Sequence, residues 1–347
     1  MRSMILAAGL GTRLRPLTYV MPKPVAPVLN RPIVAWIAEL LAGHGFGEVV
    51  TNLSYLPEQI REVLGDGSDF GLEISYSEEP EPLGTAGGVG KVRDFLSETD
   101  SFLIISGDAL TDIDLGAMRA AHEANAERGA IATLATKRVD DTTQFGVAIT
   151  DEEGRIHGFQ EKPQPAEALS DLANCGIYMF RREIFDHFPP ADQKSPAGDD
   201  DQPPGFVDWA MDVFPSLLDG DIPFYSHEID AYWNDIGSVG EYVNGNIDAL
   251  AGKVGIRPRE PQVSDGIHAG EGSDIDAAKV RAPVLIGAGS KVGVGSNLHG
   301  PVVVGENCRL GAGAMLRDCV VLPGAEVPAG ALIVGGLYGI DPDRPLG

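Results

Sequence analysis

The feature that most restricts the fold of this 347-residue chain is an aliphatic residue at every sixth position near its C-terminal end. These positions are Val280, Ile286, Val292, Leu298, Val304, Leu310, Leu316 and Leu322. Smaller residues recur four places later, at Ser290, Ser296, Val302, Cys308, Ala314 and Val320. A period of six indicates a parallel β-helix, in which each coil buries aliphatic side chains and stacks on the next coil. We therefore expect a hexapeptide-repeat β-helix over 280–336 and a tail over 337–347.

The earlier part of the chain alternates short apolar strands with helical segments. We expect strands at 49–51, 72–76 and 102–106, and helices at 32–41, 58–64, 87–96 and 115–126. Such alternation predicts an α/β fold, with a Rossmann-like, mostly parallel sheet that carries helices on both faces. Ligands of these sheets bind at the carboxyl ends of the strands. Gly9, Gly84 and Asp108 lie at or beyond such ends.

From Ile131 onwards the predicted strands are shorter, which indicates a β-rich insert at about 131–180. Helices at 207–218 and 239–250 are expected to close a domain spanning 1–251, and 252–279 has the Pro, Gly and charge content of a linker. The run Asp199–Asp201 lacks the spacing and mixed ligand types of a metal site, so we interpret it as a solvated acidic loop.

The first strand leads into a glycine-rich turn within a local excess of positive charge. Ala7, Ala8, Gly9 and Gly11 let the backbone approach a flat or charged ligand. Residues 1–38 include five cations and no Asp or Glu, although the formal net charge of the chain is -25. Leu14 replaces the third glycine of a dinucleotide fingerprint, and no Gly-Lys-Ser/Thr follows, so neither common phosphate motif fits. The pattern favours an unusual phosphate-binding loop.

Composition narrows the class of protein further. With 51 acidic and 26 basic residues, binding to nucleic acid or to an anionic membrane is unfavourable. No apolar run reaches the roughly 18 residues of a membrane span, and no signal peptide is evident, so we expect a cytoplasmic protein. Its three cysteines show no C-x-x-C spacing and predict neither disulfides nor zinc.

The stretch from Met4 to Thr18, continued by Met21-Pro-Lys-Pro24, resembles the signature loop of the sugar-1-phosphate nucleotidyltransferases. The C-terminal repeat resembles the left-handed β-helix that is a common appendage of this family. The resemblance implies that a sugar-1-phosphate attacks the α-phosphorus of a nucleoside triphosphate, which gives a nucleoside-diphosphate sugar and pyrophosphate. Because this nucleophile is already an anion, catalysis needs alignment, charge neutralisation and a divalent ion rather than a general base.

The family resemblance implies a magnesium ion held by Asp108, in Ile104-Ile-Ser-Gly-Asp108, and by Asp235, in Tyr232-Trp-Asn-Asp-Ile-Gly237. Two carboxylates together with phosphates and waters suit the octahedral geometry of Mg²⁺. For either aspartate alone, a cap or turn role is an equally good interpretation.

Two cations are candidates for contacts with the triphosphate. The planar Arg13 guanidinium can grip phosphate oxygens, and the family places Lys23, which two prolines flank, on phosphate as well. Arg15 either assists phosphate binding from the same loop or is a solvated surface residue. The predicted nucleotide-binding residues are Leu6, Ala8, Gly9, Gly11, Thr12, Gly84 and Thr85. The glycines of 84–87 can alternatively serve helix packing.

The resemblance also implies a set of sugar-phosphate ligands: Gly146, Glu161, Lys162 and Asn174. A carboxylate accepts bonds from paired sugar hydroxyls, a lysine can bind the anomeric phosphate, and an amide can do either. Glu161 and Lys162 can alternatively form an ordinary surface ion pair.

Within the family, Glu78-Glu-Pro80, the segment Val207–Phe214 and the short C-terminal repeat resemble the mannose-1-phosphate guanylyltransferases. That resemblance implies GTP and mannose-1-phosphate as substrates and GDP-mannose as product. Glucose-1-phosphate uridylyl- or thymidylyltransferase activity is the alternative. A non-catalytic sensor of nucleotide sugars is disfavoured by the presence of Arg13, Lys23, Asp108 and Asp235.

A β-helix acyltransferase is a more distant possibility, because only His268 and His299 are available in that part of the chain and no extended loop interrupts the repeat. Since β-helices end in open strand edges, we expect a homo-oligomer formed through residues from about Val280 onwards.

Overall fold

The computed structural model describes residues 1–190, 193–198 and 201–340. Asp199 and Asp200 of the predicted acidic loop, and residues 341–347 of the predicted tail, lie outside the described residues. The chain forms two compact units. Unit 1 comprises Met1–Gly9, Ile37–Ala109 and Ile113–Trp233, and unit 2 comprises Leu10–Trp36, Leu110–Asp112 and Asn234–Gly347.

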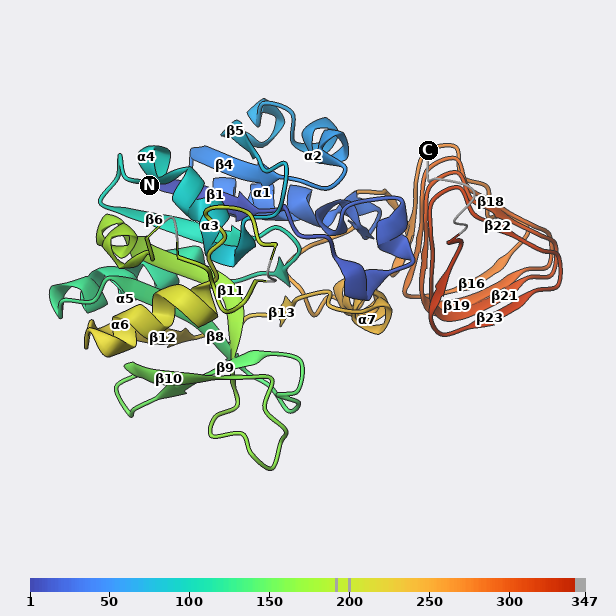
Figure 1. Ribbon diagram of the computed structural model, residues 1–347. Coiled ribbons are helices and arrows are strands. Elements are labelled where there is room, and N and C mark those ends of the chain that lie inside the picture. Colours follow the sequence, from blue (N-terminus) through green and yellow to red (C-terminus); the bar gives the residue numbers. More distant parts are fainter. Residues whose placement is uncertain (191–192, 199–200, 341–347) are drawn as a thin grey trace. The chain divides into compact units, whose positions relative to one another are not determined.

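Unit 1 is built on a nine-stranded mixed sheet in which the order β10-β9-β11-β6-β1-β4-β5 forms the main path. Its strands are β1 (Arg2–Leu6), β4 (Glu48–Leu53), β5 (Glu73–Glu78), β6 (Ser101–Ser106), β8 (Ala132–Arg138), β9 (Gly146–Thr150), β10 (Ile156–Glu161), β11 (Leu172–Arg181) and β12 (Phe224–Glu228). Strands β6, β1, β4 and β5 run parallel, and β11 pairs with β6 in the antiparallel sense. The predicted α/β sheet is therefore confirmed (Figure 1). Strands β8 and β12 were not predicted from the sequence.

The α-helices are α1 (Ile33–Gly43), α2 (Pro57–Leu64), α3 (Gly84–Lys91), α4 (Arg93–Leu96), α5 (Leu115–Glu127), α6 (Phe214–Asp219) and α7 (Val239–Leu250). Two predicted helices are divided. The segment 87–96 contains α3 and α4 because Val92 leaves the helical conformation, and 207–218 begins as a π-helical turn, η6 (Trp209–Val213), before α6. None of the helices in the described ranges is long and apolar enough to cross a membrane.

Short 3-10 turns complete the helical structure: η1 (Thr12–Leu14), η2 (Leu17–Tyr19), η3 (Lys23–Val25), η4 (Ser68–Phe70) and η5 (Arg182–His187). The core of unit 1 is rich in aromatic side chains around buried Trp209. The Trp209 ring centroid lies 4.6 Å from that of Phe180 and 5.8 Å from that of Phe214. Helix α5 packs on β8, β11 and β12, and α3 packs on β1.

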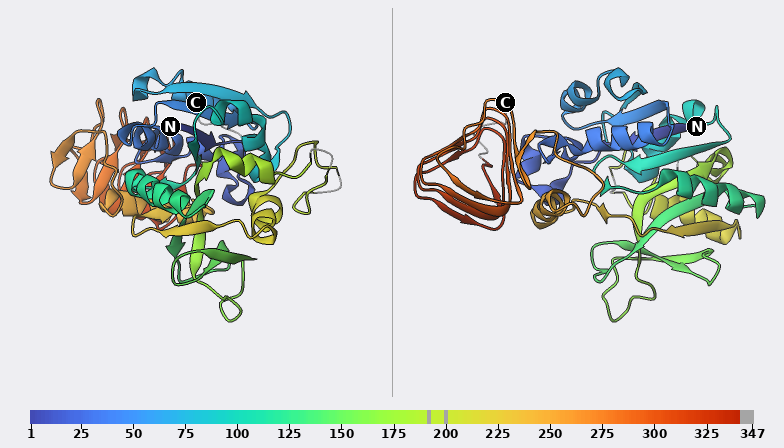
Figure 2. Two further views of the ribbon diagram at one scale, coloured as in Figure 1. Left: turned by 90° about the vertical axis from the view of Figure 1, so that its left-hand side faces the viewer. Right: turned by 180° about the vertical axis from the view of Figure 1, so that it is seen from behind.

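Unit 2 contains a parallel β-helix, as the six-residue period predicts. Its strands are β14 (Gln262–Ser264), β15 (Ile267–Ala269), β16 (Lys279–Arg281), β17 (Val284–Ile286), β18 (Lys291–Val292), β19 (Asn297–Val304), β20 (Arg309–Leu310), β21 (Met315–Val321), β22 (Glu326–Val327), β23 (Leu332–Val334) and β24 (Leu337–Tyr338). Ile286 pairs with Val304, and Leu298 with Leu316, so equivalent aliphatics stack in the core. The coils trace a triangle in Figure 1 and in the right-hand view of Figure 2.

A buried serine hydroxyl links neighbouring coils. Ser290 is fully buried, and its hydroxyl accepts a hydrogen bond from the Cys308 amide, 18 residues later, at 2.9 Å. That separation corresponds to three six-residue repeats per coil. The segment 252–279, read as a linker, also contributes to this structure, because β15 pairs in parallel with β17. All three cysteines are buried and free.

Four further short strands are β2 (Pro27–Val28), β3 (Arg31–Pro32), β7 (Leu110–Thr111) and β13 (Trp233–Asn234). Strands β2 and β3 form a hairpin immediately after Lys23. Helix α7 packs against β19 and β21, so the phosphate-loop segment, α7 and the β-helix belong to one unit.

Candidate active site

The predicted site residues fall into two groups. Unit 1 contains Leu6, Ala8, Gly9, Gly84, Thr85, Asp108, Gly146, Glu161, Lys162 and Asn174. Unit 2 contains Gly11, Thr12, Arg13, Lys23 and Asp235.

In unit 2, two cations of the phosphate loop meet Asp235. The Lys23 side chain is buried, and its Nζ donates a hydrogen bond to the Asp235 carbonyl oxygen at 2.6 Å. The Arg13 guanidinium lies 3.5 Å from the Asp235 carboxylate, and its side chain is 55% exposed. A buried ammonium needs fixed oxygen partners because burial removes its hydration. The structure therefore brings together three of the four predicted catalytic residues.

Glycines lie on both sides of this cluster. Gly11 has a φ of +59°, and a Cβ there would lie 3.0 Å from Lys23 Cβ and 3.1 Å from Thr18 Cγ2. The Thr18 hydroxyl also donates to the Gly11 carbonyl at 2.8 Å. At Gly237, a Cβ would lie 2.8 Å from Asp235 Oδ2 and 3.1 Å from the Arg13 guanidinium. The positive φ and these neighbours favour glycine at position 11. At position 237, a Cβ would displace the ends of the Asp235 and Arg13 side chains.

Asp235 also makes a turn contact, as the alternative interpretation from the sequence allows. Its Oδ1 accepts a hydrogen bond from the Gly237 amide at 3.1 Å, while Oδ2 is the oxygen nearest to Arg13. Ile236, between these residues, has a φ of 48°, which is uncommon for a β-branched side chain. Such backbone strain recurs at functional sites, where surrounding contacts hold it in place.

In unit 1, a buried polar network that the sequence analysis missed fixes the end of β1. The Ala7 amide donates to Asn52 Oδ1 at 2.7 Å, and Asn52 Nδ2 donates to Glu79 Oε1 at 2.8 Å. Glu79 Oε2 accepts from the Leu83 amide at 3.1 Å, and Glu79 is only 2% exposed. The network joins the predicted nucleotide loop to the residue that precedes α3. The sequence signal for this network was the position of two polar residues, Asn52 and Glu79, at or just after the ends of β4 and β5.

The Gly84–Thr85 segment packs closely on the chain near Val207. A Cβ at Gly84 would lie 2.4 Å from the Val207 carbonyl oxygen, and that oxygen accepts hydrogen bonds from two α3 amides. The Thr85 hydroxyl donates to Asp208 at 2.7 Å and accepts from the Trp209 amide at 3.0 Å. These contacts show a packing role for Gly84 and Thr85, whereas nucleotide binding by them stays a prediction.

Asp108 follows β6 at a point where the chain lies against the end of β1. The Gly107 amide donates to the Leu6 carbonyl at 2.8 Å, and a Cβ at Gly107 would lie 2.9 Å from the same oxygen. The predicted metal ligand and the predicted nucleotide loop, at Leu6, Ala8 and Gly9, therefore start from neighbouring strand ends.

Of the predicted sugar-side residues, Gly146, Glu161 and Asn174 lie on β9, β10 and β11, and Lys162 directly follows β10. Gly146 pairs with Glu161, and a Cβ at Gly146 would lie 3.1 Å from Glu161 Oε2. Lys162 Nζ lies 2.6 Å from Glu161 Oε1, and both side chains are about half exposed. Lys162 has a φ of 45°, which a simple surface ion pair does not require.

Asn174 stands at an irregularity in β11, where the register with β8 shifts. Its Oδ1 accepts from the Gly176 amide, and its Nδ2 donates to the Tyr178 hydroxyl, both at 3.0 Å. Burial raises the pKa of Tyr178 above its ordinary value. The Asn174 amide is thus held in a fixed orientation.

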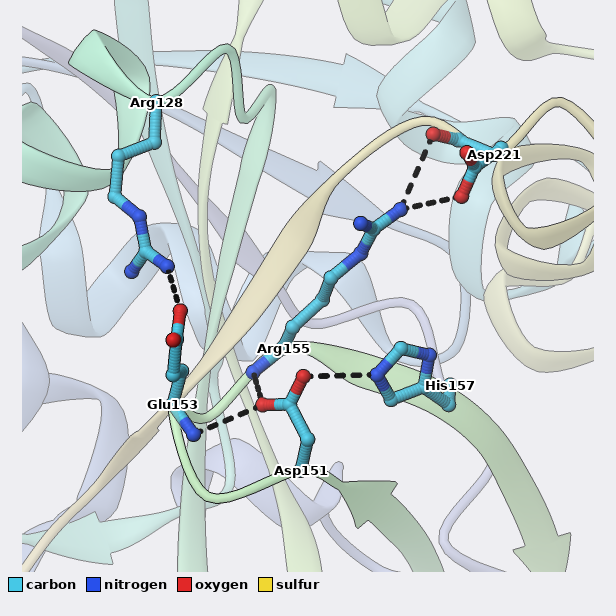
Figure 3. Close-up of polar contacts among 6 residues, drawn as sticks. All are labelled: Arg128, Asp151, Glu153, Arg155, His157 and Asp221. Atoms are coloured by element: carbon cyan, nitrogen blue, oxygen red, sulfur yellow. Dashed lines mark hydrogen bonds and ion pairs between the residues drawn. The ribbon is translucent and has the colours of Figure 1, made fainter.

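The opposite end of β10 is fixed by ion pairs around the β9–β10 turn (Figure 3). One Asp151 oxygen accepts bonds from the Glu153 and Arg155 amides at 2.9 Å, and the other lies 3.0 Å from His157 Nε2. The hydrogen bond from His157 holds the pKa of Asp151 below its usual value. Arg155 also pairs with Asp221, and Arg128 with Glu153. The turn is therefore braced well away from Glu161.

The carboxylates allow an Mg²⁺ site only with further oxygen ligands. Among the described residues, no group of three or more His, Cys, Asp or Glu could hold a metal by itself. Mg²⁺ is often bound through one or two carboxylates, with substrate phosphates and waters supplying the other oxygens. Asp108 and Asp235 fit that pattern by chemistry.

Comparison with known proteins identifies the family. Residues 2–252 match the family model described as "Nucleotidyl transferase", and residues 283–318 match "Bacterial transferase hexapeptide (six repeats)". The first match covers more than half of the chain, so the chain belongs to the nucleotidyl transferase family and is a sugar-1-phosphate nucleotidyltransferase.

Two curated relatives align with nearly the whole chain. A Synechocystis protein named UTP–glucose-1-phosphate uridylyltransferase is 36% identical over 97% of this chain and 87% of its own length. A Mycobacterium tuberculosis protein named mannose-1-phosphate guanylyltransferase is 33% identical over 95% of this chain and 82% of its own length. A solved structure from Bacillus anthracis, assigned as a glucose-1-phosphate thymidylyltransferase, has a TM-score of 0.61 and 25% identity, covering 74% of this chain and 97% of that chain.

Proposed function

We propose that the chain transfers a guanylyl group from GTP to mannose-1-phosphate, forming GDP-mannose and pyrophosphate. The main support for this reaction is that both Lys23 and Arg13 contact Asp235. In a chain of net charge -25, two cations directed to one point give a local positive site for a polyanionic substrate. The full-length similarity to the Mycobacterium tuberculosis guanylyltransferase supports this substrate pair.

In this proposal Arg13 and Lys23 neutralise the charge that develops on the leaving pyrophosphate. The Arg13 guanidinium can bind two phosphate oxygens, while the Lys23 ammonium is already oriented by the Asp235 carbonyl. Lys162 and Glu161 hold the sugar phosphate and its hydroxyls, and Asn174 contributes an amide of fixed orientation. The anionic phosphate of the sugar is the nucleophile, so none of these residues needs to remove a proton from it.

We further propose Mg²⁺ as the cofactor, with Asp108 and Asp235 as its protein ligands. When bound, Mg²⁺ neutralises phosphate charge and orients the reacting groups. Family membership supports a divalent ion in general terms.

Uridylyl transfer to glucose-1-phosphate is the second candidate, because the Synechocystis relative of that name is 36% identical. A panel of GTP, UTP and dTTP against mannose-1-phosphate and glucose-1-phosphate, measured by pyrophosphate release, distinguishes the two. We expect the highest kcat/KM for GTP with mannose-1-phosphate. A higher value for UTP with glucose-1-phosphate would replace this substrate assignment by the second candidate.

We also propose that the chain forms a homo-oligomer through its β-helix. Met315 and Leu332 are neighbours on β21 and β23, and both are exposed, by 46% and 67%. Val334, on the same strand as Leu332, is also exposed, and β23 ends the main strand path of this sheet. An apolar patch at a strand edge is a typical self-association surface.

A further inference from the structure

The hairpin that follows Lys23 has an unfavourable turn. Strands β2 and β3 are joined by Leu29 and Asn30, whose φ values are 51° and 61°. A two-residue turn with both φ values positive favours Asn or Gly, and leucine is uncommon there. Leu29 is nevertheless buried, so neighbouring contacts must hold the turn in this conformation.

Helix α7 supplies the first set of these contacts. Asn246 Oδ1 accepts from the Leu29 amide at 3.0 Å, and Asn246 Nδ2 lies 3.4 Å from the Pro27 carbonyl oxygen. The Tyr242 hydroxyl donates to the same carbonyl at 2.6 Å. Both side chains are fully buried. Helix α7 begins at Val239, four residues after Asp235, so the same helix starts close to Asp235 in the chain and bonds to the hairpin that follows Lys23.

The β-helix supplies the second set. Asn30 Nδ2 donates to the Val304 carbonyl, at the end of β19, at 3.1 Å and to Glu260 Oε1 at 2.9 Å. Helix α7 also packs on β19. The turn is therefore bonded on one side to α7 and on the other to the β-helix, all within unit 2.

We propose that Asn30, Tyr242 and Asn246 are positioning residues that keep Lys23 beside Asp235, which makes the β-helix a structural part of the catalytic loop. This inference rests on the catalytic role proposed above for Lys23. A residue displaced by about 1 Å from its productive position can cost as much as roughly a hundredfold in rate. Loss of the hairpin contacts is therefore expected to lower kcat while the protein stays folded.

The principal test is Asn30→Gly in the full-length protein. Glycine tolerates the positive φ, so the change removes the side-chain bonds without adding backbone strain. Asn307→Gly is the matched control, because Asn307 is another left-handed asparagine, with a φ of 56°, within the β-helix. We expect Asn30→Gly to stay folded and to lower kcat about ten- to a hundredfold, with the KM for the sugar phosphate unchanged. Its Tm should lie below that of Asn307→Gly, because it loses two side-chain hydrogen bonds. Asn307→Gly should keep the wild-type kcat.

Tyr242→Phe is the second variant, since it removes only a hydroxyl from the helix side of the turn. Tyr242→Phe should also lower kcat. If Asn30→Gly does not fold, Tyr242→Phe alone tests whether the hairpin contacts position Lys23. Wild-type kcat in folded Asn30→Gly and Tyr242→Phe would overturn the positioning role. Wild-type kcat together with a wild-type KM for the nucleotide in Lys23→Ala would instead overturn the proposed role of Lys23, so the two failures are distinguishable.

Discussion

Lys23 Nζ donates a hydrogen bond to the backbone carbonyl oxygen of Asp235 at 2.6 Å, although the two residues are 212 positions apart. The lysine comes from the N-terminal loop, and the aspartate from the segment that leads into α7. The bond to the backbone carbonyl of Asp235 orients the Lys23 ammonium, and it leaves the Asp235 carboxylate to other partners. This arrangement suits a cation that must be in place before the substrate arrives.

The first prediction separates the two lysines. Lys23→Ala should chiefly lower kcat or impair nucleotide use, because Lys23 is assigned to the triphosphate. Lys162→Ala should chiefly raise the KM for the sugar phosphate, because Lys162 follows the sugar-hydroxyl candidate Glu161. Each lost charged hydrogen bond should cost about 1.5 to 3 kcal/mol, or roughly ten- to a hundredfold.

Steady-state kinetics with one substrate varied at a time would show this separation. Identical effects of both variants on both substrates would instead mean that the lysines serve one shared group of phosphates.

The second prediction concerns buried Glu79. In Glu79→Gln, the amide can accept only one of the two bonds now made by the carboxylate and would direct a donor at another donor. The free energy of unfolding should fall by about 1.5 to 3 kcal/mol, and the KM for the nucleotide should rise because the Ala7–Asn52–Glu79 network loosens.

The neighbouring Glu78→Gln is the control. Glu78 forms an exposed ion pair with Arg61, so its loss should cost no more than about 1 kcal/mol. Both variants should be compared by urea unfolding. If their free energies of unfolding were equal, the buried network would not contribute to stability as proposed.

The difference between these neighbouring glutamates illustrates what the sequence can predict. The six-residue period identified the β-helix. It was wrong for the last positions, because the core contains Cys319 and Val321 rather than Val320 and Leu322, after a register shift between β19 and β21. The alternation of strands and helices likewise predicted an α/β fold with a mostly parallel sheet. The sequence does not show which of Glu78 and Glu79 is buried, because that depends on Asn52, which lies on another strand. The Asn30–Val304 bond was equally out of reach, since it joins residues 274 positions apart.

The third prediction concerns His122, which is buried between the hydroxyls of Thr133 and Ser101, each 3.2 Å away. Burial lowers the pKa of His122 to about 4 from an ordinary value of 6.5. The unfolded chain therefore takes up a proton in a range where the folded protein does not. This stabilisation is present above pH 6.5 and is lost as the pH falls towards 4.

Between pH 7 and pH 5, this one group should lower the free energy of unfolding by about 2 kcal/mol. Other groups also titrate, so wild type should be compared with His122→Gln by urea unfolding at both pH values. We expect a smaller decrease for the variant. Equal decreases in the two proteins would contradict the assignment.

The fourth prediction concerns the exposed patch on β21 and β23. Leu332→Glu should dissociate the proposed assembly, because it places a charge in the centre of the apolar contact. Lys279→Glu, on β16 of the same β-helix but at a position already charged, is the control and should leave the mass unchanged. Light scattering would report both masses. A wild-type protein that is already a monomer at working concentration would refute self-association.

The conformation and contacts of the turns around the site were the hardest features to predict from the sequence. Gly11 and Gly237 were visible as glycines, but the reasons for them are their distances to Lys23 and Asp235, which only the folded chain supplies. Gly84 and Thr85 matched a familiar order of residues, yet their contacts are with Val207, Asp208 and Trp209. A motif therefore located the segment correctly without revealing the packing of its side chains.

The most direct test of the account is pyrophosphate release by wild type, Asp108→Asn and Asp235→Asn, with GTP, mannose-1-phosphate and Mg²⁺. Each variant removes a carboxylate charge and keeps the size of the side chain, and Asp235→Asn retains the carbonyl that accepts the Lys23 bond. We predict turnover reduced by orders of magnitude in both variants with little change in Tm, because charge neutralisation and positioning supply most of the catalysis. Near-normal turnover in either folded variant would contradict the assignment of that aspartate to the metal.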